Sequence, residues 1–105
     1  MTTKLIYPQK ENVKMVQNII KAVSEVWGLT TEQILQPTRG KANTTFARHL
    51  CMALAYRITS LTMMQIAEAF RRDYTSVIYA IKKVDQASND KELAPLIREV
   101  LNKIK

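Results

Sequence analysis

The sequence has little glycine, cysteine and histidine, and each shortage excludes a class of chemistry. A phosphate-binding loop needs framing glycines and a Lys followed by Ser or Thr, whereas the pair Gly40-Lys41 is followed by Ala42. Cys51 is the single cysteine, so an internal disulfide is excluded. His49 is two positions from Cys51 on an expected helix, so the two side chains point to different faces and form neither a metal site nor a nucleophile pair. We therefore expect no enzymatic activity, no metal and no cofactor.

Long apolar runs and acidic residues are scarce as well. No apolar stretch approaches the length that crosses a bilayer, and the first residues lack the apolar core of a signal peptide, so we expect a cytoplasmic location. Nine acidic residues oppose sixteen basic ones, and the net charge of +7 indicates an anionic partner. A membrane-surface helix would combine a basic face with an exposed apolar face, and no segment does so clearly. We expect neither a membrane partner nor a small-molecule substrate.

The apolar residues recur at helical spacing, and no segment alternates with the period of a strand. A chain of 105 residues has the size of one domain, so we expect an all-α, compact domain of about six helices. Residues 1–10 have no clear period and are predicted to form an N-terminal arm that packs through the apolar residues 5–7. Residues 11–105 are predicted to form a single helical domain, whose first helix covers 11–27 and ends at Gly28.

Polar residues spaced three apart mark where further helices begin. Three pairs fit the capping box, in which each side chain satisfies a free backbone amide of the first turn. These pairs are Thr30 with Gln33, Thr62 with Gln65, and Asn89 with Glu92. Asp73 is expected to cap one more helix, because its carboxylate can accept hydrogen bonds from first-turn amides. Pro37 ends the short helix that begins at Thr30, and a long helix is predicted over 44–59.

Residues 62–84 have the layout of a helix-turn-helix, with a short helix, a basic turn and a second helix that starts with polar residues. Basic residues concentrate around this motif. Residues 39–83 hold eight of them against two acidic residues, which is six of the seven net positive charges. They are Arg39, Lys41, Arg48, Arg57, Arg71, Arg72, Lys82 and Lys83. A solvated surface would spread its charges more evenly, so this clustering favours nucleic-acid binding.

The stretch from residue 48 to residue 84 follows the pattern of a known family. Arg48 is followed by Met-Ala-Leu-Ala at 52–55, Thr at 59, Ile-Ala-Glu-Ala-Phe at 66–70 and Arg-Arg-Asp-Tyr-Thr-Ser-Val at 71–77. This stretch resembles the C-terminal DNA-binding domain of the bacterial replication initiator DnaA. The resemblance implies a Trp-repressor-like fold in which the second helix of the motif enters the major groove of DNA.

The resemblance also implies roles for the start of that second helix. In the family, an Asp-His-Thr-Thr segment contacts base edges, and Asp73, Tyr74, Thr75 and Ser76 hold these places here. Thr75 offers a hydroxyl group for hydrogen bonds and a methyl group for thymine. Asp73 either accepts from a cytosine amino group or caps the helix. Arg72 matches the arginine of the family's signature, and the resemblance implies that it contacts a phosphate or a base.

The other predicted DNA contacts are basic or hydroxyl side chains around the motif. The resemblance implies contacts to the DNA backbone from Arg48, Thr59 and Thr62, and to the minor groove from Arg39 and Lys41. Charge alone adds Arg71, Lys82 and Lys83. Contacts to phosphate fix the register of a protein on DNA without reading its sequence.

The sequence departs from the family in three ways. The two glycines before the family's arginine are missing and the turn is one residue shorter, so we expect a changed angle of the recognition helix. The family's histidine is replaced by Tyr74, which either contacts DNA or packs into the core. The family's ATPase lies outside this sequence, so we expect a stand-alone DNA-binding domain without initiator activity.

We therefore expect sequence-specific binding of double-stranded DNA, in the regulation of replication or transcription, at the nucleoid. Replication or regulatory proteins are considered as additional partners. Two alternatives stay open: a protein-interaction module on the same scaffold, and a small architectural protein that binds DNA without sequence preference. Tyr79 also stays open between stacking on a base or sugar and partial burial. His49 is expected at the surface, within reach of a phosphate.

Overall fold

Six helices make up the part of the chain that the computed structural model describes, residues 3–36 and 42–104, with side chains described from Lys10 onward. They are α1 (Thr3–Trp27), α2 (Thr31–Leu35), α3 (Ala42–Ile58), α4 (Met63–Phe70), α5 (Tyr74–Ala87) and α6 (Leu93–Ile104). These residues contain no strand. The prediction of an all-α domain of about six helices is confirmed, and α4 and α5 form the expected helix-turn-helix.

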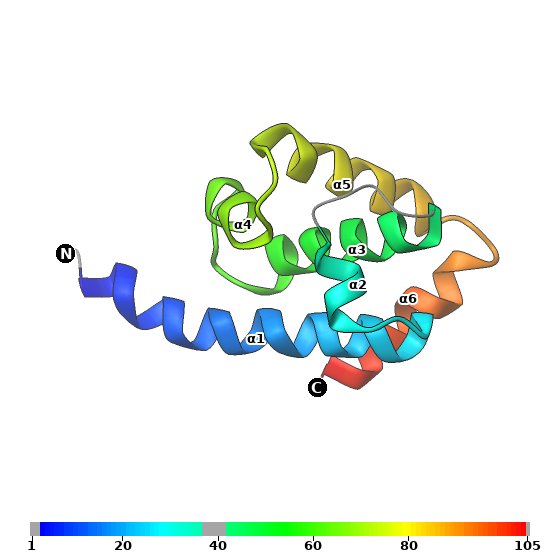
Figure 1. The fold of residues 1–105 in the computed structure, drawn as a ribbon, viewed down its shortest axis with the longest axis horizontal. Helices are drawn as coiled ribbons and strands as arrows, with labels where there is room; N and C mark the ends of the chain where they lie inside the picture. The colour runs from blue at the N-terminus through cyan, green and yellow to red at the C-terminus, as the bar shows by residue number, and fades with distance from the viewer. Residues whose placement is uncertain (1–2, 37–41, 105) are drawn as a thin grey trace.

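Helix α3 is the centre of the fold (Figure 1). It packs against α5, α4, α2 and α1, with α5 above it and α1 below it in Figure 1. Six consecutive residues of α3, 50–55, are buried, so the middle of this helix has no side that faces solvent. Met52 is 1% exposed and belongs to the core. Ala53, Ala55 and Cys51 are small enough to let neighbouring helices approach closely.

Helix α1 begins at Thr3, so residues 3–10 are part of it and do not form the separate arm predicted from the sequence. The prediction relied on the weak apolar period of these residues and on Pro8, which lacks an amide proton. A missing hydrogen bond near a helix end is tolerated where packing further along stabilises the helix, and Ile19 and Val23 are fully buried. The first turns of α1 extend beyond the other helices (Figure 1).

Two of the three predicted capping boxes are present with both of their hydrogen bonds. Thr30 and Gln33 exchange bonds at 2.8 and 3.0 Å, and Thr62 and Gln65 do so at 2.9 and 3.1 Å. Gly28 ends α1 with a φ of 70°, in the left-handed region that glycine favours, as predicted.

The third predicted box, Asn89 with Glu92, is wrong. The carboxylate of Asp90 accepts hydrogen bonds from the backbone amides of Glu92 at 2.8 Å and Leu93 at 3.1 Å. Because α6 begins at Leu93, Asp90 is the residue whose side chain reaches the free amides of the first turn. Helix α6 then buries Ile97 and Val100 and packs against α1.

Candidate nucleic-acid interface

The turn between α4 and α5 forms without glycine. Arg71 adopts the left-handed conformation, with φ 55° and ψ 47°, at the position where a helix most often ends in glycine. The backbone amides of Arg71 and Arg72 bond the carbonyls of Glu68 at 3.1 Å and Ala67 at 2.8 Å, which closes the last turn of α4. Arg71 therefore adopts the backbone conformation that glycine usually provides at a helix end, and it adds an exposed positive charge beside the start of α5.

Helix α5 begins with exposed side chains. Asp73 occupies the N-cap position, with φ −73° and ψ 155°, but its carboxylate makes no capping hydrogen bond to any described residue. Asp73, Tyr74 and Thr75 are all exposed. Tyr74 is 49% exposed, so it does not pack into the core, which was one of the two alternatives left by the sequence. Of the four predicted reading residues, only Ser76 is half-buried.

The exposed stripe of α5 continues from Thr75 toward the end of the helix. Tyr79, Lys82 and Lys83 are exposed, whereas Val77, Ala80 and Val84 on the opposite side are buried in the core. Residues four apart on a helix lie one above the other, so Thr75 and Tyr79 share one face. The helix thus presents hydroxyl, aromatic and basic groups along its outer surface.

Tyr79 holds a small cluster together with His49 of α3 and Lys83 of α5. The ring of His49 meets the ring of Tyr79 edge-on, with 5.3 Å between centroids, and the Lys83 ammonium lies 5.8 Å from the Tyr79 ring. Tyr79 is 53% exposed, and His49 is half-buried. The sequence left Tyr79 open between stacking on DNA and burial and expected His49 at the surface, within reach of a phosphate. The contact between α3 and α5 that brings the two residues together leaves no short-range pattern in the sequence.

His49 lies in a positively charged environment. Burial lowers the pKa of its imidazole below the usual 6.5, and the charges of Arg48, Lys83 and Arg72 lower this pKa further. The imidazole is therefore predominantly neutral near pH 7. An anion placed near these cations would relieve their repulsion and favour the charged imidazolium.

Arg48 and Arg72 donate hydrogen bonds to the end of α2. Arg48 is only 4% exposed, and its Nε donates to the carbonyl oxygen of Ile34 at 2.7 Å. The guanidinium of Arg72 donates to the carbonyl oxygen of Gln36. Burial and the nearby charge of Arg72 lower the pKa of Arg48. Both side chains thus take part in the protein's own structure, and their contacts to DNA stay predictions.

The hydroxyl groups of the turn before α4 are also used internally. The Thr59 hydroxyl donates to the carbonyl oxygen of Ala55 and accepts from the amide of Leu61 at 3.2 Å. The Thr62 hydroxyl accepts from the Gln65 amide in the capping box. These bonds fix the path of the chain into α4, and the contacts of Thr59 and Thr62 to the DNA backbone stay predictions.

The other basic residues fall into different groups. Arg39 and Lys41 lie outside the described residues. Arg57 pairs with the carboxylate of Asp85, which joins the end of α3 to α5 and offsets part of the charge there.

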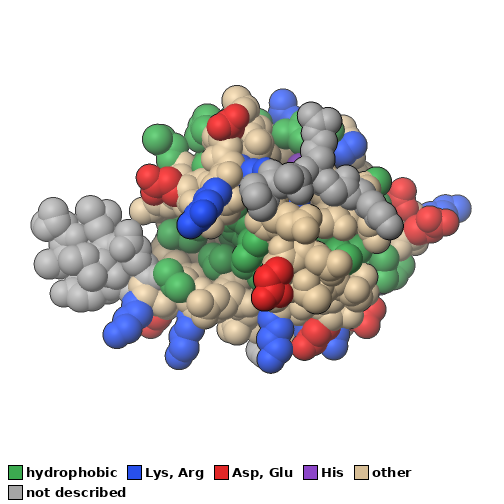
Figure 2. Space-filling view, viewed as in Figure 1, with side chains coloured by type: hydrophobic (Ala, Val, Ile, Leu, Met, Phe, Trp, Pro, Cys, Tyr) green, Lys and Arg blue, Asp and Glu red, His purple; other side chains and the backbone are tan. Residues whose placement is uncertain are grey.

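Figure 2 shows that Lys and Arg side chains alternate with Asp and Glu side chains along the edge formed by α1. That edge is therefore not uniformly basic.

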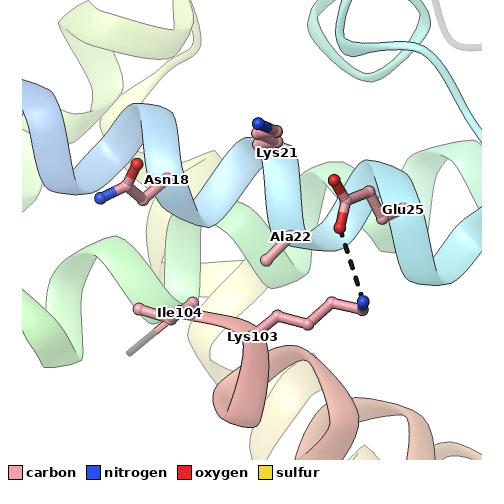
Figure 3. Close-up of a pocket in the computed structure, with 6 residues that line it drawn as sticks. All are labelled: Asn18, Lys21, Ala22, Glu25, Lys103 and Ile104. Carbon is pink, nitrogen blue, oxygen red and sulfur yellow. Dashed lines mark ion pairs between the residues drawn. The ribbon is translucent and has the colours of Figure 1, made fainter.

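The hollow between α1 and α6 does not resemble a catalytic centre. It has a volume of about 410 Å³, and Lys103 of α6 reaches across it to the carboxylate of Glu25 at 3.5 Å (Figure 3). This ion pair joins the last helix to the first.

Within residues 3–36 and 42–104, no group of His, Cys, Asp and Glu is arranged to hold a metal ion, and no helix has the length and apolar character needed to cross a membrane. Cys51 is fully buried, and burial raises the pKa of its thiol.

Comparison with known proteins points to one family. Residues 16–84 match the family described as the bacterial dnaA protein helix-turn-helix. This span starts inside α1, contains α2, α3 and α4, and ends in α5. It therefore covers the buried centre of the fold and nearly the whole helix-turn-helix.

Individual relatives agree with this match. The chain is 32% identical to the chromosomal replication initiator protein DnaA of Corynebacterium jeikeium, over 95% of this chain and 18% of that protein. It is 30% identical to DnaA 2 of Protochlamydia amoebophila, over 95% of this chain and 22% of that protein. It is 37% identical to DnaA of Aquifex aeolicus, over 70% of this chain and 18% of that protein. The chain spans about a fifth of the length of these relatives.

Proposed function

Because the chain belongs to the family of bacterial DnaA helix-turn-helix domains, we propose that it binds double-stranded DNA with sequence preference through α5. The observation that carries this proposal is the exposed start of α5, where Asp73, Tyr74 and Thr75 follow a basic turn. Helices of this motif read base edges with their N-terminal residues. Since the relatives are named replication initiators, the proposed role is the regulation of replication or of transcription.

Base readout is assigned to the first turn of α5. The Thr75 side chain carries both a hydrogen-bonding group and a methyl group suited to thymine. The carboxylate of Asp73 is exposed and makes no capping bond among the described residues, so it is available to accept from a cytosine amino group. This supports the reading role of Asp73 over the capping role, the two alternatives that the sequence left open.

Phosphate binding is assigned to the basic side chains around this turn. Arg71 lies directly before it, and Lys82 and Lys83 follow on the exposed side of the same helix. Contacts of this kind supply affinity that falls with salt and fix the register of the protein on DNA. Tyr79 lies between Thr75 and Lys83 along the helix and is exposed, which favours contact with a sugar or base over burial.

The test is a fluorescence-anisotropy titration on a duplex containing a DnaA box and on a scrambled duplex of equal length, at low and near-physiological salt. We expect tighter binding to the box that persists at the higher salt. Lys83→Ala should weaken binding to both duplexes and reduce the salt slope by about one. Lys91→Ala, an exposed lysine in the turn before α6, serves as the matched control and should leave both unchanged.

Two other outcomes would replace this proposal. Equal binding to both duplexes, lost at the higher salt, would leave an architectural protein without sequence preference. No binding at low salt would favour a protein-interaction module. One observation supports this second candidate: Tyr56, Met64 and Tyr74 are 39%, 68% and 49% exposed around a hollow of about 560 Å³ at the start of α4.

A further inference from the structure

Two arginines from different elements meet the carboxyl end of α2. Arg48 of α3 donates from Nε to the carbonyl oxygen of Ile34, and Arg72 of the α4–α5 turn donates to the carbonyl oxygen of Gln36. Ile34 lies in α2, and Gln36 is its C-cap. The last carbonyl groups of a helix lack partners within the helix and carry partial negative charge, so guanidinium groups suit this place.

The contact of Arg72 lies next to the residues proposed to read DNA. Arg72 directly precedes Asp73, the N-cap of α5, and its partner Gln36 is the C-cap of α2. Gln36 and Arg72 are 36 residues apart in the sequence. One side chain therefore links the start of α5 to the end of α2.

Arg48 supports the same end of α2 from the interior. Its side chain is buried and its bond to Ile34 spans 14 residues of sequence. Two positive side chains near one another repel, so their convergence on α2 needs a compensating partner. The two carbonyl groups are such partners, and a planar guanidinium with several fixed donors can hold such a bond while keeping further donors for other groups.

We propose that Arg72, supported by Arg48, is a positioning residue that fixes the end of α2 relative to the start of α5. The pair contributes to sequence preference by holding the first turn of α5 in one orientation relative to the end of α2, and not by neutralising a phosphate. This inference rests on the proposed function, since it concerns how the same interface is held in shape.

The decisive variant is Arg72→Lys, because it keeps the charge and removes the planar donor group. We expect the preference for a DnaA-box duplex over a scrambled duplex to fall about tenfold. Affinity for the scrambled duplex should stay within about twofold, and the salt slope should not change. Lys83→Ala is the comparison, and it should weaken both duplexes equally and reduce the slope by about one.

Two results of the binding experiments would overturn the proposal. One is a preference in Arg72→Lys equal to that of the unmodified protein. The other is an equal loss on both duplexes in Arg72→Ala, together with a slope reduced by about one, which would make Arg72 a phosphate contact. Thermal unfolding of each variant checks that the fold is kept.

A measurement without DNA separates this proposal from the proposed function. Amide hydrogen exchange over residues 31–36 in the free protein should become faster in Arg72→Lys and stay unchanged in Lys83→Ala. If the unmodified protein shows no preference for the box, the proposed function fails, and hydrogen exchange alone then decides the link. Unchanged exchange in Arg72→Lys would refute it.

Discussion

The two helices of the helix-turn-helix begin in different ways. At the start of α4, Thr62 and Gln65 exchange both bonds of a capping box, so the side chains there are occupied by the protein's own backbone. At the start of α5, Asp73 holds the cap position without such a bond to the described residues, and Tyr74 and Thr75 are exposed. One start stabilises the fold, and the other leaves its polar groups available.

This difference separates the residues that stabilise the fold, at the start of α4, from the residues proposed to read DNA, at the start of α5. A polar side chain that caps a helix contributes about 1 kcal/mol to stability. A polar side chain that reads a base contributes only in the complex, and in the free protein it is solvated. Substitutions at the two starts should therefore affect different measurements.

The largest effect is expected at the start of α5. Thr75→Ala removes a hydroxyl group and a methyl group that face solvent, so the preference for a box duplex over a scrambled duplex should fall by roughly 1–3 kcal/mol. The free energy of unfolding should change by less than about 0.5 kcal/mol, because the side chain is exposed. Anisotropy titrations and urea unfolding measure the two quantities.

The control for this prediction is Thr31→Ala, an exposed threonine at the start of α2. It should leave both DNA affinities unchanged. An equal loss of affinity on both duplexes in Thr75→Ala would contradict base reading at this position and would remove the contrast between the two helix starts.

The next effect is expected at the start of α4 and in the opposite measurement. Thr62→Ala breaks the capping box and should lower the free energy of unfolding by about 1 kcal/mol, whereas Asp73→Ala should lower it by less than about 0.5 kcal/mol. Chemical denaturation of both variants gives the comparison directly. Equal destabilisation would mean that Asp73 caps α5 in solution.

The sequence predicted the helices and most of their ends, because these depend on local patterns. Capping boxes at Thr30 and Thr62 and the glycine end of α1 are set by residues within a few positions of one another. The box at Asn89 failed because the neighbouring Asp90 competes for the same amides. A pattern cannot decide between two adjacent capping residues.

The candidate site was predicted less completely, because it depends on contacts between distant residues. Arginine is usually found at the surface, but the packing of α2 on α3 buries Arg48 against Ile34. His49 and Tyr79 are far apart in the sequence, and only the packing of α3 on α5 brings their rings into contact. Asp73 was correctly placed at a helix start, but the direction of its carboxylate has no sequence signal.

The turn that separates the two helix starts offers a smaller effect. Arg71→Gly removes the cost of a left-handed residue with a Cβ and adds the entropy of glycine in the unfolded chain, so we expect a net gain of about 0.5 kcal/mol in unfolding free energy. The loss of one exposed charge should at the same time weaken binding to both duplexes. Arg71→Ala separates the two effects, because it removes the charge and keeps the strain. A lower stability of Arg71→Gly than of Arg71→Ala would contradict this account of the turn.

The last predicted effect depends on pH and on the charges near α5. Three cations lie near His49: the buried Arg48 next to it on α3, Arg72 in the turn, and Lys83 on α5. They and burial lower the pKa of His49 in the free protein, and bound phosphates would raise it again, so binding should take up a proton. Affinity for DNA should therefore rise about three- to tenfold as the pH falls from about 7.5 to about 5.5.

The stability of the free protein should change in the opposite direction. A histidine whose pKa is lowered by folding contributes stability above the usual value of 6.5, and this contribution is lost as the pH falls through the lowered pKa. His49→Gln, which cannot be protonated, should bind DNA with little dependence on pH and lose the acid-side decrease in stability. Anisotropy titrations at several pH values compare the two proteins. An unchanged pH dependence in His49→Gln, or weaker binding by the unmodified protein on acidification, would show that phosphates do not approach this cluster, and the DNA contact of α5 would then be confined to its first turn.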